Sequence, residues 1–373
     1  MAGAAGAERS APLLERMREL IARAGPLRLD RFMEIALQDP EHGYYRRGTP
    51  IGRAGDFITA PEISQIFGEL AGLWLAERWM TMGRPAPVRL VELGPGRGTL
   101  MADIWRACRV VPGFHEAATI HLVESNACLA AEQTRRLPQA RLHADITELP
   151  DGPMLVIANE FFDALPIRQF LRTRHGWRER AVGFDDRTGR LVWTDVPVAE
   201  ADLRAFVPAR LAAEAAEGAV IEVSPAARAL AEALARRLAA AGGAALIIDY
   251  GCMGPAVGDT LQAVHRHRPA DPLARPGEQD LTAHVDFAPL AAAARQAGLA
   301  VFGPVPQGRF LLELGLAVRL ERLCRGKPPA VAEELRRGAR RLVAPEEMGE
   351  LFRVMAWTGI AGTPPGFGPG AAA

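Results

Sequence analysis

The stretch Val88-Arg-Leu-Val-Glu-Leu-Gly-Pro-Gly-Arg-Gly-Thr-Leu100 decides the fold of this chain. Its apolar run, residues 88–93, ends in glycines at positions 94, 96 and 98, and apolar residues at helical spacing follow at once. Glycine lets the backbone turn tightly and approach a ligand closely. The first turn of a helix offers unpaired N–H groups and a partial positive charge. The order of strand, glycine turn and helix therefore predicts a nucleotide-type ligand site at the carboxyl end of a sheet strand.

The glycine spacing distinguishes between kinds of nucleotide site. A dinucleotide fingerprint, Gly-x-Gly-x-x-Gly, would need its third glycine where this chain has Thr99. No Gly-Lys-Ser or Gly-Lys-Thr follows the turn, so a phosphate-binding P-loop is absent as well. The remaining pattern, Glu92-x-Gly94-x-Gly96-x-Gly98, resembles motif I of the class I S-adenosylmethionine methyltransferases. An ordinary glycine turn between a strand and a helix is the alternative interpretation.

Acidic residues at the ends of three predicted strands suit S-adenosylmethionine, which carries an ammonium, a carboxylate and a ribose but no phosphate. Glu92 can face the ammonium, while the glycine N–H groups can approach the carboxylate and the ribose. Glu124 follows a strand predicted at 119–123, where such sheets bind ribose hydroxyls. Asp145, after a strand at 140–144, can accept from the adenine amino group while Ile146 covers the ring. The predicted cofactor-binding residues are Glu92, Gly94, Gly96, Gly98, Thr99, Glu124, Asp145, Ile146, Asn159, Asp56 and Thr59.

A second polar stretch follows the next predicted strand. Residues 153–158 are an uninterrupted apolar run, as a buried parallel strand should be, and Asn159-Glu160-Phe161-Phe162-Asp163-Ala164-Leu165-Pro166 comes directly after it. Polar groups therefore appear at the sheet edge where the sulfonium would lie. We expect Asn159, Glu160 and Asp163 to bind the methyl acceptor, with a turn or helix cap as the alternative for Asp163.

Composition limits the classes of function. The chain has 373 residues, with 44 Lys and Arg against 44 Asp and Glu, so the basic excess typical of nucleic-acid binders is missing. The four cysteines lie far apart, which argues against a disulfide framework or zinc and suits a reducing cytoplasm. The pair His265 and His267 has no third ligand nearby, so we predict no metal site. No apolar window is long enough to span a membrane.

Hydrophobic periodicity also predicts the organisation of the chain. The expected parts are a disordered N-terminus at 1–11, a helical cap with a cofactor-covering loop at 12–85, a methyltransferase core at 86–325 with an insertion at 167–215, and a C-terminal helical extension with a loose tail at 326–373.

Three stretches within these parts carry more detailed expectations. Residues 167–198 alternate as a β-meander does, whereas residues 252–280 read as a loop. From Phe310 onward the chain reads as mostly helical, and its apolar residues would form core or the face of a homodimer.

Five motifs taken together resemble the MidA family, from about Leu29 to about Trp357. They are Gly43-Tyr44-Tyr45, Gly55-Asp56-Phe57-Ile58-Thr59-Ala60-Pro61-Glu62, Glu92-Leu93-Gly94-Pro95-Gly96-Arg97-Gly98-Thr99, the stretch Asn159 to Pro166, and Asp280-Leu281-Thr282-Ala283-His284-Val285-Asp286-Phe287.

The resemblance implies an α/β, Rossmann-like class I methyltransferase fold with a mostly parallel sheet, a helical N-terminal cap, a β-meander insertion and a helical C-terminal region. It also implies methyl transfer from S-adenosylmethionine to an arginine of a partner protein. In the mitochondrial member that partner is a core subunit of complex I, and the product is symmetric dimethylarginine. Two alternatives stay open: a cofactor-binding assembly scaffold with little turnover, and a small-molecule methyltransferase or NAD enzyme.

Chemistry assigns roles to the acceptor-site residues. Arginine stays protonated in water, so an enzyme must hold the guanidinium in line with the methyl carbon and offset its charge. We predict that Glu160, supported by Asp163 or Asp286, binds the guanidinium bidentately. His284 would orient a carboxylate or relay the lost proton. A cap at a helix start is the alternative for His284 and Asp286.

Overall fold

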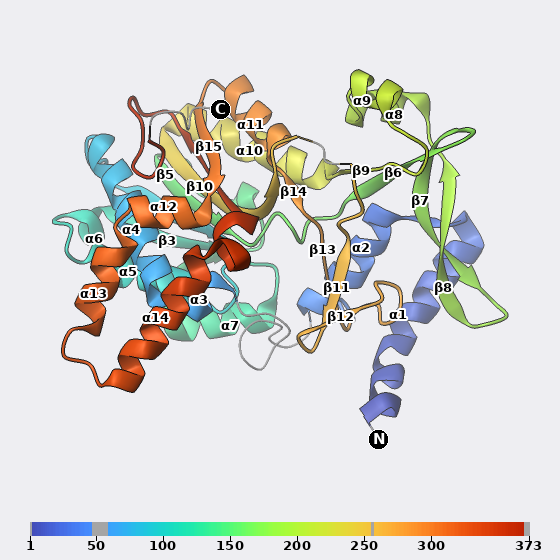
Figure 1. Ribbon diagram of the computed structural model, residues 1–373, viewed down its shortest axis with the longest axis horizontal. Helices are drawn as coiled ribbons and strands as arrows, with labels where there is room; N and C mark the ends of the chain where they lie inside the picture. Colours follow the sequence, from blue (N-terminus) through green and yellow to red (C-terminus); the bar gives the residue numbers. More distant parts are fainter. Residues whose placement is uncertain (1, 47–58, 255–256, 369–373) are drawn as a thin grey trace.

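An eight-stranded sheet forms the centre of the computed structural model, which describes residues 2–46, 59–254 and 257–368, with side chains from residue 12 on (Figure 1). From β10 to β4 all neighbouring strands are parallel, and β16 is antiparallel to both of its neighbours. β14 (Val285–Asp286) pairs with the end of β10. The order across the sheet is β15 (Ala300–Pro306), β16 (Phe352–Thr358), β10 (Gly243–Cys252), β5 (Met154–Asn159), β2 (Val88–Leu93), β3 (Ala118–Val123) and β4 (Arg141–His143).

Alternating side chains of these strands pack against helices on both faces of the sheet. Along β10, Leu246 and Ile248 join one hydrophobic cluster, while Ala245 and Ile247 join the other. The second face is covered by α10 (Pro225–Ala241) and α11 (Phe287–Gln296). The first is covered by α4 (Gln65–Thr81), α5 (Thr99–Cys108), α6 (Phe114–Ala117), α12 (Gln307–Glu313), α13 (Leu316–Cys324) and α14 (Pro329–Val343).

Four expected strands are present in the large sheet. Those predicted at 88–93, 119–123, 140–144 and 153–158 are confirmed as β2, β3, β4 and β5. Each is followed by a polar or glycine-containing turn at the same edge of the sheet. The described residues at this edge include short α3 (Ala60–Ile63), α7 (Ala127–Arg136) and η2 (Ile146–Glu148).

The β-meander is confirmed, but its sheet is larger than the expected insertion at 167–215. β6 (Arg168–Thr173), β7 (Gly176–Asp185) and β8 (Arg190–Pro197) pair antiparallel, followed by α8 (Glu200–Phe206) and α9 (Ala209–Glu214). The sheet gains β1 (Leu27–Arg28) on β7 and β9 (Val220–Val223) on β6. The cap and the insertion therefore share one sheet, which lies apart from the large sheet in Figure 1.

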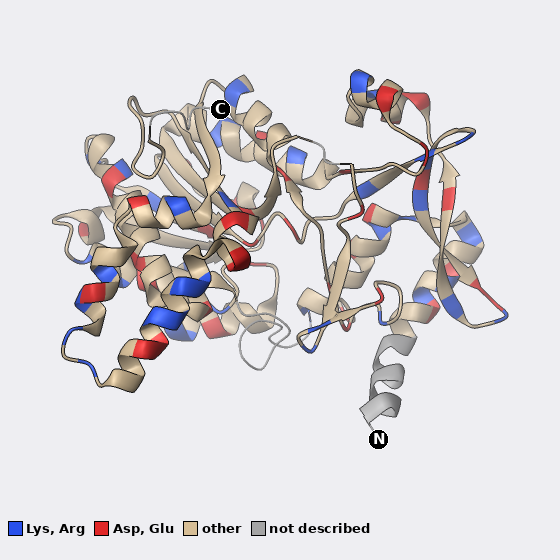
Figure 2. Ribbon diagram, in the orientation of Figure 1, with Lys and Arg blue, Asp and Glu red and all other residues tan. Residues whose placement is uncertain are grey.

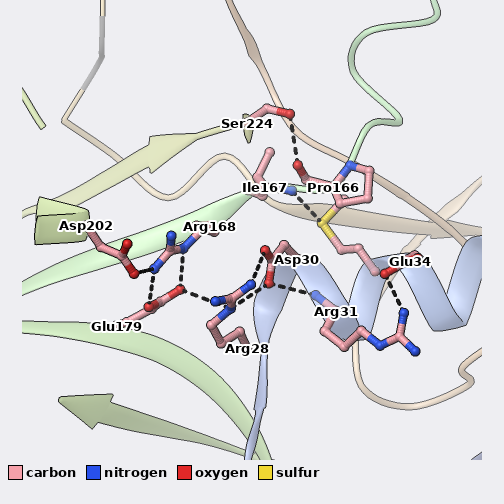
Figure 3. A network of polar contacts seen from close by, with 11 residues as sticks. Arg28, Asp30, Arg31, Glu34, Pro166, Ile167, Arg168, Glu179, Asp202 and Ser224 are labelled. Atoms are coloured by element: carbon pink, nitrogen blue, oxygen red, sulfur yellow. Dashed lines mark hydrogen bonds and ion pairs between the residues drawn. The ribbon is translucent and has the colours of Figure 1, made fainter. Parts of the chain in front are cut away.

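A buried ion-pair network joins the strands of the five-stranded sheet (Figure 3). Arg168 is 4% exposed and donates two hydrogen bonds of 2.7 Å to Glu179, which is 3% exposed. Asp202 of α8 accepts a third from Arg168 at 2.8 Å. Arg28 of β1 approaches Glu179 at 3.9 Å, so the network reaches the N-terminal cap.

The N-terminal segment differs from the expected disorder at 1–11. Helix α1 (Ala2–Ala24) begins at residue 2 and continues through Pro12. It is followed by α2 (Leu29–Gln38) and η1 (Tyr44–Arg46), which share a hydrophobic cluster with the meander. Among the described helices of the expected cap at 12–85, only α1, α2 and η1 are therefore packed on the insertion, whereas α4 packs on the large sheet.

Two further expectations about secondary structure are wrong. The stretch 252–280 is not a plain loop, because β11 (Gln262–His265), β12 (Arg268–Ala270) and β13 (Asp280–Thr282) form a small antiparallel sheet. The C-terminal region is not helical throughout, because η3 (Pro345–Gly349) leads into β16. β16 fills the place between β10 and β15 and completes the large sheet.

Acidic and basic residues are intermixed on the outer parts of the fold. Figure 2 shows both signs on the helices and on the five-stranded sheet, while the strands of the large sheet are almost wholly tan. Among the residues that the structure describes, no helix has the length and apolar character needed to cross a bilayer.

Candidate active site

The glycine turn after β2 has the predicted geometry. Gly94, Gly96 and Gly98 have φ angles of 62°, 51° and 76°, a region that other residues rarely adopt. Gly98 is the N-cap of α5, so the helix points its free N–H groups into the turn. A Cβ on Gly94 would lie 2.6 Å from the ring of Phe161, which shows how closely the segment after β5 packs on this turn.

Glu92 is buried beside the turn with an unused oxygen. The side chain is 3% exposed, and its Oε2 has no hydrogen-bond partner among the described residues. Burial raises the pKa of Glu92 to about 8, an effect that the Met101 N–H opposes and the Glu124 charge reinforces. Because an unpaired buried carboxylate is costly, this oxygen fits a donor on a bound molecule, such as an ammonium.

Glu124 lies at the end of the neighbouring strand, β3. Its Oε1 accepts from the N–H of Asn126 at 2.8 Å, and Oε2 accepts from Gln133 at 3.4 Å. Burial raises its pKa to about 7. Gln133 of α7 also donates to the carbonyl of Gly96 at 2.7 Å, so it ties Glu124 to the glycine turn. Sequence reasoning missed Gln133, which carries no local signal in the helix.

Asp145 and Ile146 lie one strand further along the sheet edge. Asp145 is exposed and caps η2, since its Oδ1 accepts from the N–H and hydroxyl of Thr147 at 2.8 and 2.7 Å. The Thr147 N–H lowers the pKa of Asp145 and keeps it ionised. Ile146 is buried in the second hydrophobic cluster. Their contact with adenine stays a prediction.

Thr99, Thr59 and Asp56 are three further residues predicted to bind the cofactor. The Thr99 hydroxyl donates to Glu62 at 2.5 Å and accepts from Arg136 at 2.5 Å, so it holds α5 to α3 and α7. Thr59 precedes α3, and its carbonyl accepts from Glu62 N–H at 2.9 Å. Asp56 lies outside the described residues. The cofactor-binding roles of all three stay predictions.

The segment after β5 places Glu160 at the same edge. Glu160 has a φ of 50°, in the left-handed region. Its Oε1 accepts from the N–H of Ala60 at 2.9 Å and from Nδ2 of Asn159 at 3.1 Å. Burial raises the pKa of Glu160 to about 7. Oδ1 of Asn159 is buried with no partner among the described residues, so a second unused oxygen faces this region.

Asp163 and Asp249 bring two more carboxylates beside Glu160. Burial raises the pKa of Asp163 to about 6, against the effect of a hydrogen bond from Tyr250. Asp249, near the end of β10, is fully buried, and burial together with the Asp163 and Glu160 charges raises its pKa. Sequence reasoning did not assign Asp249 or Tyr250 to the site. The signal was present, because both follow the apolar run of β10 just as Glu92 ends β2.

Tyr45 extends this group from the cap side. Its hydroxyl donates to Asp280 at 2.7 Å. Burial and the charges of Asp280 and Asp163 raise the pKa of Tyr45. Tyr45 of the cap and Tyr250 of β10 thus each bond to a carboxylate, those of Asp280 and Asp163.

His284 and Asp286 are not joined to the carboxylate group directly. Asp286 caps α11, accepting from Ala288 N–H at 2.9 Å and Gly254 N–H at 3.0 Å, and burial raises its pKa. The exposed His284 stacks edge-on against Tyr250 at 5.3 Å. Both line a cavity of about 370 Å³ between α10, α11 and β9, to which Phe162 also contributes. Asp286 thus has the capping role, and a catalytic role stays a prediction for both.

His265, one of the two histidines considered as a metal site, has other partners. Nδ1 of His265 contacts the carbonyl of Glu278 at 2.9 Å, and Nε2 contacts Arg275 at 3.1 Å. Within residues 2–46, 59–254 and 257–368, no cluster of three or more metal-ligating side chains occurs.

Comparison with known proteins identifies this arrangement. Residues 70–305 match the model of a family described as S-adenosyl-L-methionine-dependent methyltransferases. The chain belongs to this methyltransferase family. Protein arginine methyltransferase NDUFAF7 of mitochondria is 37% identical in Rattus norvegicus and 35% identical in Homo sapiens, with 92% of this chain aligned to 84% and 83% of theirs.

A solved structure supports both the fold and the cofactor. A COG1565 superfamily member from Burkholderia thailandensis, crystallised with S-adenosyl-homocysteine, superposes with a TM-score of 0.85 at 32% identity. The alignment covers 99% of this chain and 97% of that one. The methyltransferase therefore has the class I fold and uses S-adenosyl-L-methionine, and the unpaired oxygen of Glu92 beside the glycine turn fits that cofactor.

Proposed function

We propose that this methyltransferase transfers the methyl group of S-adenosyl-L-methionine to an arginine side chain of a partner protein. The observation that supports it is a group of three carboxylates beside the glycine turn, those of the partly exposed Glu160 and the buried Asp163 and Asp249. Among the described residues, no lysine or arginine forms an ion pair with any of them, and the Arg341 charge only modestly opposes the rise in the pKa of Glu160. Such a group favours a cationic ligand.

The chemistry of guanidinium suits these carboxylates. Glu160, supported by Asp163, binds the planar cation bidentately and holds one nitrogen in line with the methyl carbon. The cofactor supplies a methyl already activated on a sulfonium. As the N–C bond forms and the C–S bond breaks, the nitrogen loses a proton. Carboxylates whose pKa values lie at about 6 and 7 accept it well at neutral pH.

The cofactor is held, in this proposal, by residues at the ends of four strands, β2, β3, β4 and β5. Glu92 binds the ammonium with its unpaired oxygen, Glu124 binds the ribose hydroxyls, and the N–H groups of the glycine turn approach the carboxylate. Asp145 and Ile146 border the adenine. Asn159 turns its unpaired Oδ1 towards the same region.

The partner is proposed from the relatives. NDUFAF7 proteins are named as protein arginine methyltransferases, and the MidA resemblance extends that to a core subunit of complex I. We propose a respiratory complex I subunit as the partner of this chain as well.

His284 contacts Tyr250, which in turn bonds to Asp163, so in this proposal His284 orients the acceptor carboxylates indirectly.

Two measurements test the proposal. Calorimetric titration with S-adenosyl-L-methionine and, separately, NADH should give micromolar binding of the first alone. Tritiated cofactor should then label a protein in lysate from a strain that lacks the enzyme, and mass spectrometry should find dimethylarginine at the labelled site. Cofactor binding with no labelled protein would favour an assembly scaffold, and labelling of small molecules alone would favour a metabolite methyltransferase.

A further inference from the structure

Asp249 makes an unusual set of hydrogen bonds to the segment after β5. Its Oδ2 accepts from three consecutive backbone N–H groups, those of Phe161, Phe162 and Asp163, at 3.2, 2.9 and 3.2 Å. Its Oδ1 accepts from the N–H of Tyr250 at 3.0 Å. Both oxygens of a fully buried side chain are thus used as acceptors for backbone groups.

The backbone of this segment needs such an acceptor. Glu160 has a φ of 50°, which turns the N–H groups of the next three residues towards one point. Convergent N–H groups form a nest, a concavity that binds an anion. Without a partner these buried donors would be unsatisfied, and the left-handed conformation of Glu160 would lose its support.

The same three bonds set the directions of the neighbouring side chains. The Phe161 ring packs on Gly94 of the glycine turn. The Phe162 ring lies edge-on to the Phe161 ring, with 5.5 Å between the ring centroids, and lines the cavity. Glu160 points in turn to the N–H of Ala60. A shift of the segment would therefore move Glu160 and Phe161 together, relative to the cofactor turn.

We propose that Asp249 is a positioning residue, which fixes Glu160 and Asp163 for the methyl acceptor through the backbone of residues 161–163. Asp249 does not itself touch the acceptor. The proposal rests on the function proposed above, because it assigns Glu160 and Asp163 to acceptor binding.

The substitution Asp249→Asn tests it. The amide keeps one acceptor oxygen and places an NH₂ donor against either the N–H of Tyr250 or the three N–H groups of the nest. We expect the kcat for methyl transfer from tritiated cofactor into lysate protein to fall about 10²-fold, as a misplacement of about 1 Å produces. The KM for S-adenosyl-L-methionine should change much less than kcat, because most of the proposed cofactor ligands, Glu92, Glu124 and the glycine turn among them, follow β2 and β3 rather than β5.

A matched control separates this effect from general damage. Asp185 also accepts a backbone N–H, that of Arg187 at 3.0 Å, in the distant β7–β8 hairpin. Asp185→Asn should leave both kcat and KM unchanged. An equal fall in both variants, or an unchanged kcat in Asp249→Asn, would overturn the proposal.

Hydrogen exchange gives a readout that does not depend on turnover. In the wild-type enzyme the amides of residues 161–163 should exchange slowly, and in Asp249→Asn they should exchange faster while β2 and β3 stay protected. Rapid exchange of these amides in the wild type would overturn the positioning role even if the variant fails to fold. Slow exchange of the amides of residues 161–163, combined with an absence of arginine methylation, would refute the proposed function. It would leave standing the hydrogen bonding of this segment by Asp249.

Discussion

The carboxylate of Glu160 accepts a hydrogen bond from the backbone N–H of Ala60, which lies 100 residues earlier in the chain, at 2.9 Å. This bond joins the end of β5 to the start of α3. It therefore connects the residues proposed to bind the acceptor with the segment that follows the N-terminal cap.

Glu160→Gln removes the charge and keeps an oxygen for Ala60. We expect kcat to fall by about 10²-fold or more, since the uncharged amide cannot offset a guanidinium or accept its proton. Cofactor affinity, measured by calorimetry, should be unchanged. Full activity of this variant would remove Glu160 from the proposed mechanism.

Glu92→Gln should weaken cofactor binding and also change how the free energy of unfolding depends on pH. Loss of a charged partner for the ammonium should weaken cofactor binding by about 1.5–3 kcal/mol, roughly ten- to a hundredfold. Without cofactor, burial holds the proton on Glu92 of the folded protein up to its raised pKa of about 8, while the unfolded chain releases that proton near the ordinary pKa of 4.5. The free energy of unfolding of the wild type therefore falls between these pH values, and the glutamine variant should lack that fall. Urea titrations of both proteins from pH 5 to 8 measure it.

Activity should rise with pH on the acidic side. Guanidinium binding needs ionised carboxylates, and the pKa values of Asp163 and Glu160 are raised to about 6 and 7. The kcat/KM for the acceptor protein should therefore increase from pH 5, pass its half-maximum near the pKa of Glu160 and level off about one pH unit higher. A flat profile would show that the acceptor does not depend on these groups. Glu160→Gln should change the shape of this rise of kcat/KM with pH.

Gly94→Ala should destabilise the glycine turn by more than the free-energy cost of a left-handed φ angle. The new Cβ would meet the ring of Phe161 at 2.6 Å, whereas Gly189, with a similar φ of 66°, has open space around it. Gly189→Ala should cost about 1–2 kcal/mol of stability and leave cofactor affinity unchanged. Gly94→Ala should cost more and also weaken cofactor binding, as calorimetry and urea unfolding of the two variants would show.

Arg168→Met should destabilise the five-stranded sheet strongly. It removes both hydrogen bonds to the buried Glu179 and leaves Arg28, at 3.9 Å, as its remaining cation, and such a loss typically costs about 3–5 kcal/mol. The exposed pair Arg210 and Glu214 provides the comparison, and Arg210→Ala should cost only about 0.3–0.5 kcal/mol. Equal midpoints in urea for the two variants would contradict a structural role of the buried network.

Local signals made much of the sheet predictable. Gly94 follows β2 and Glu160 follows β5, and the apolar run with the residues after it predicts both strand ends correctly to within one residue. β16 was missed because Phe352-Arg-Val-Met-Ala-Trp-Thr358 is buried on both faces and shows no alternation. A short apolar run of this kind does not distinguish a helix from a strand.

Site residues could be predicted from the sequence only where an acidic residue stands beside the apolar run of its own strand. Glu92, Glu124 and Glu160 each follow an apolar run, so each was identified alone. The role of Asp249 depends on N–H groups 86 to 88 residues earlier, and no pattern in the sequence pairs them. Asp286 showed the opposite case, because a helix cap and a catalytic acid have the same signal in sequence.

The position of β16 also has a consequence for synthesis on the ribosome. It is the last strand of the large sheet to be made, yet it lies between β10 and β15, which do not pair with each other. While residues 307–351 are being translated, the nascent chain carries two unpaired strand edges on either side of an empty place. Such edges readily accept foreign strands. Protection by chaperones should therefore matter most for this enzyme in the interval just before residues 352–358 emerge.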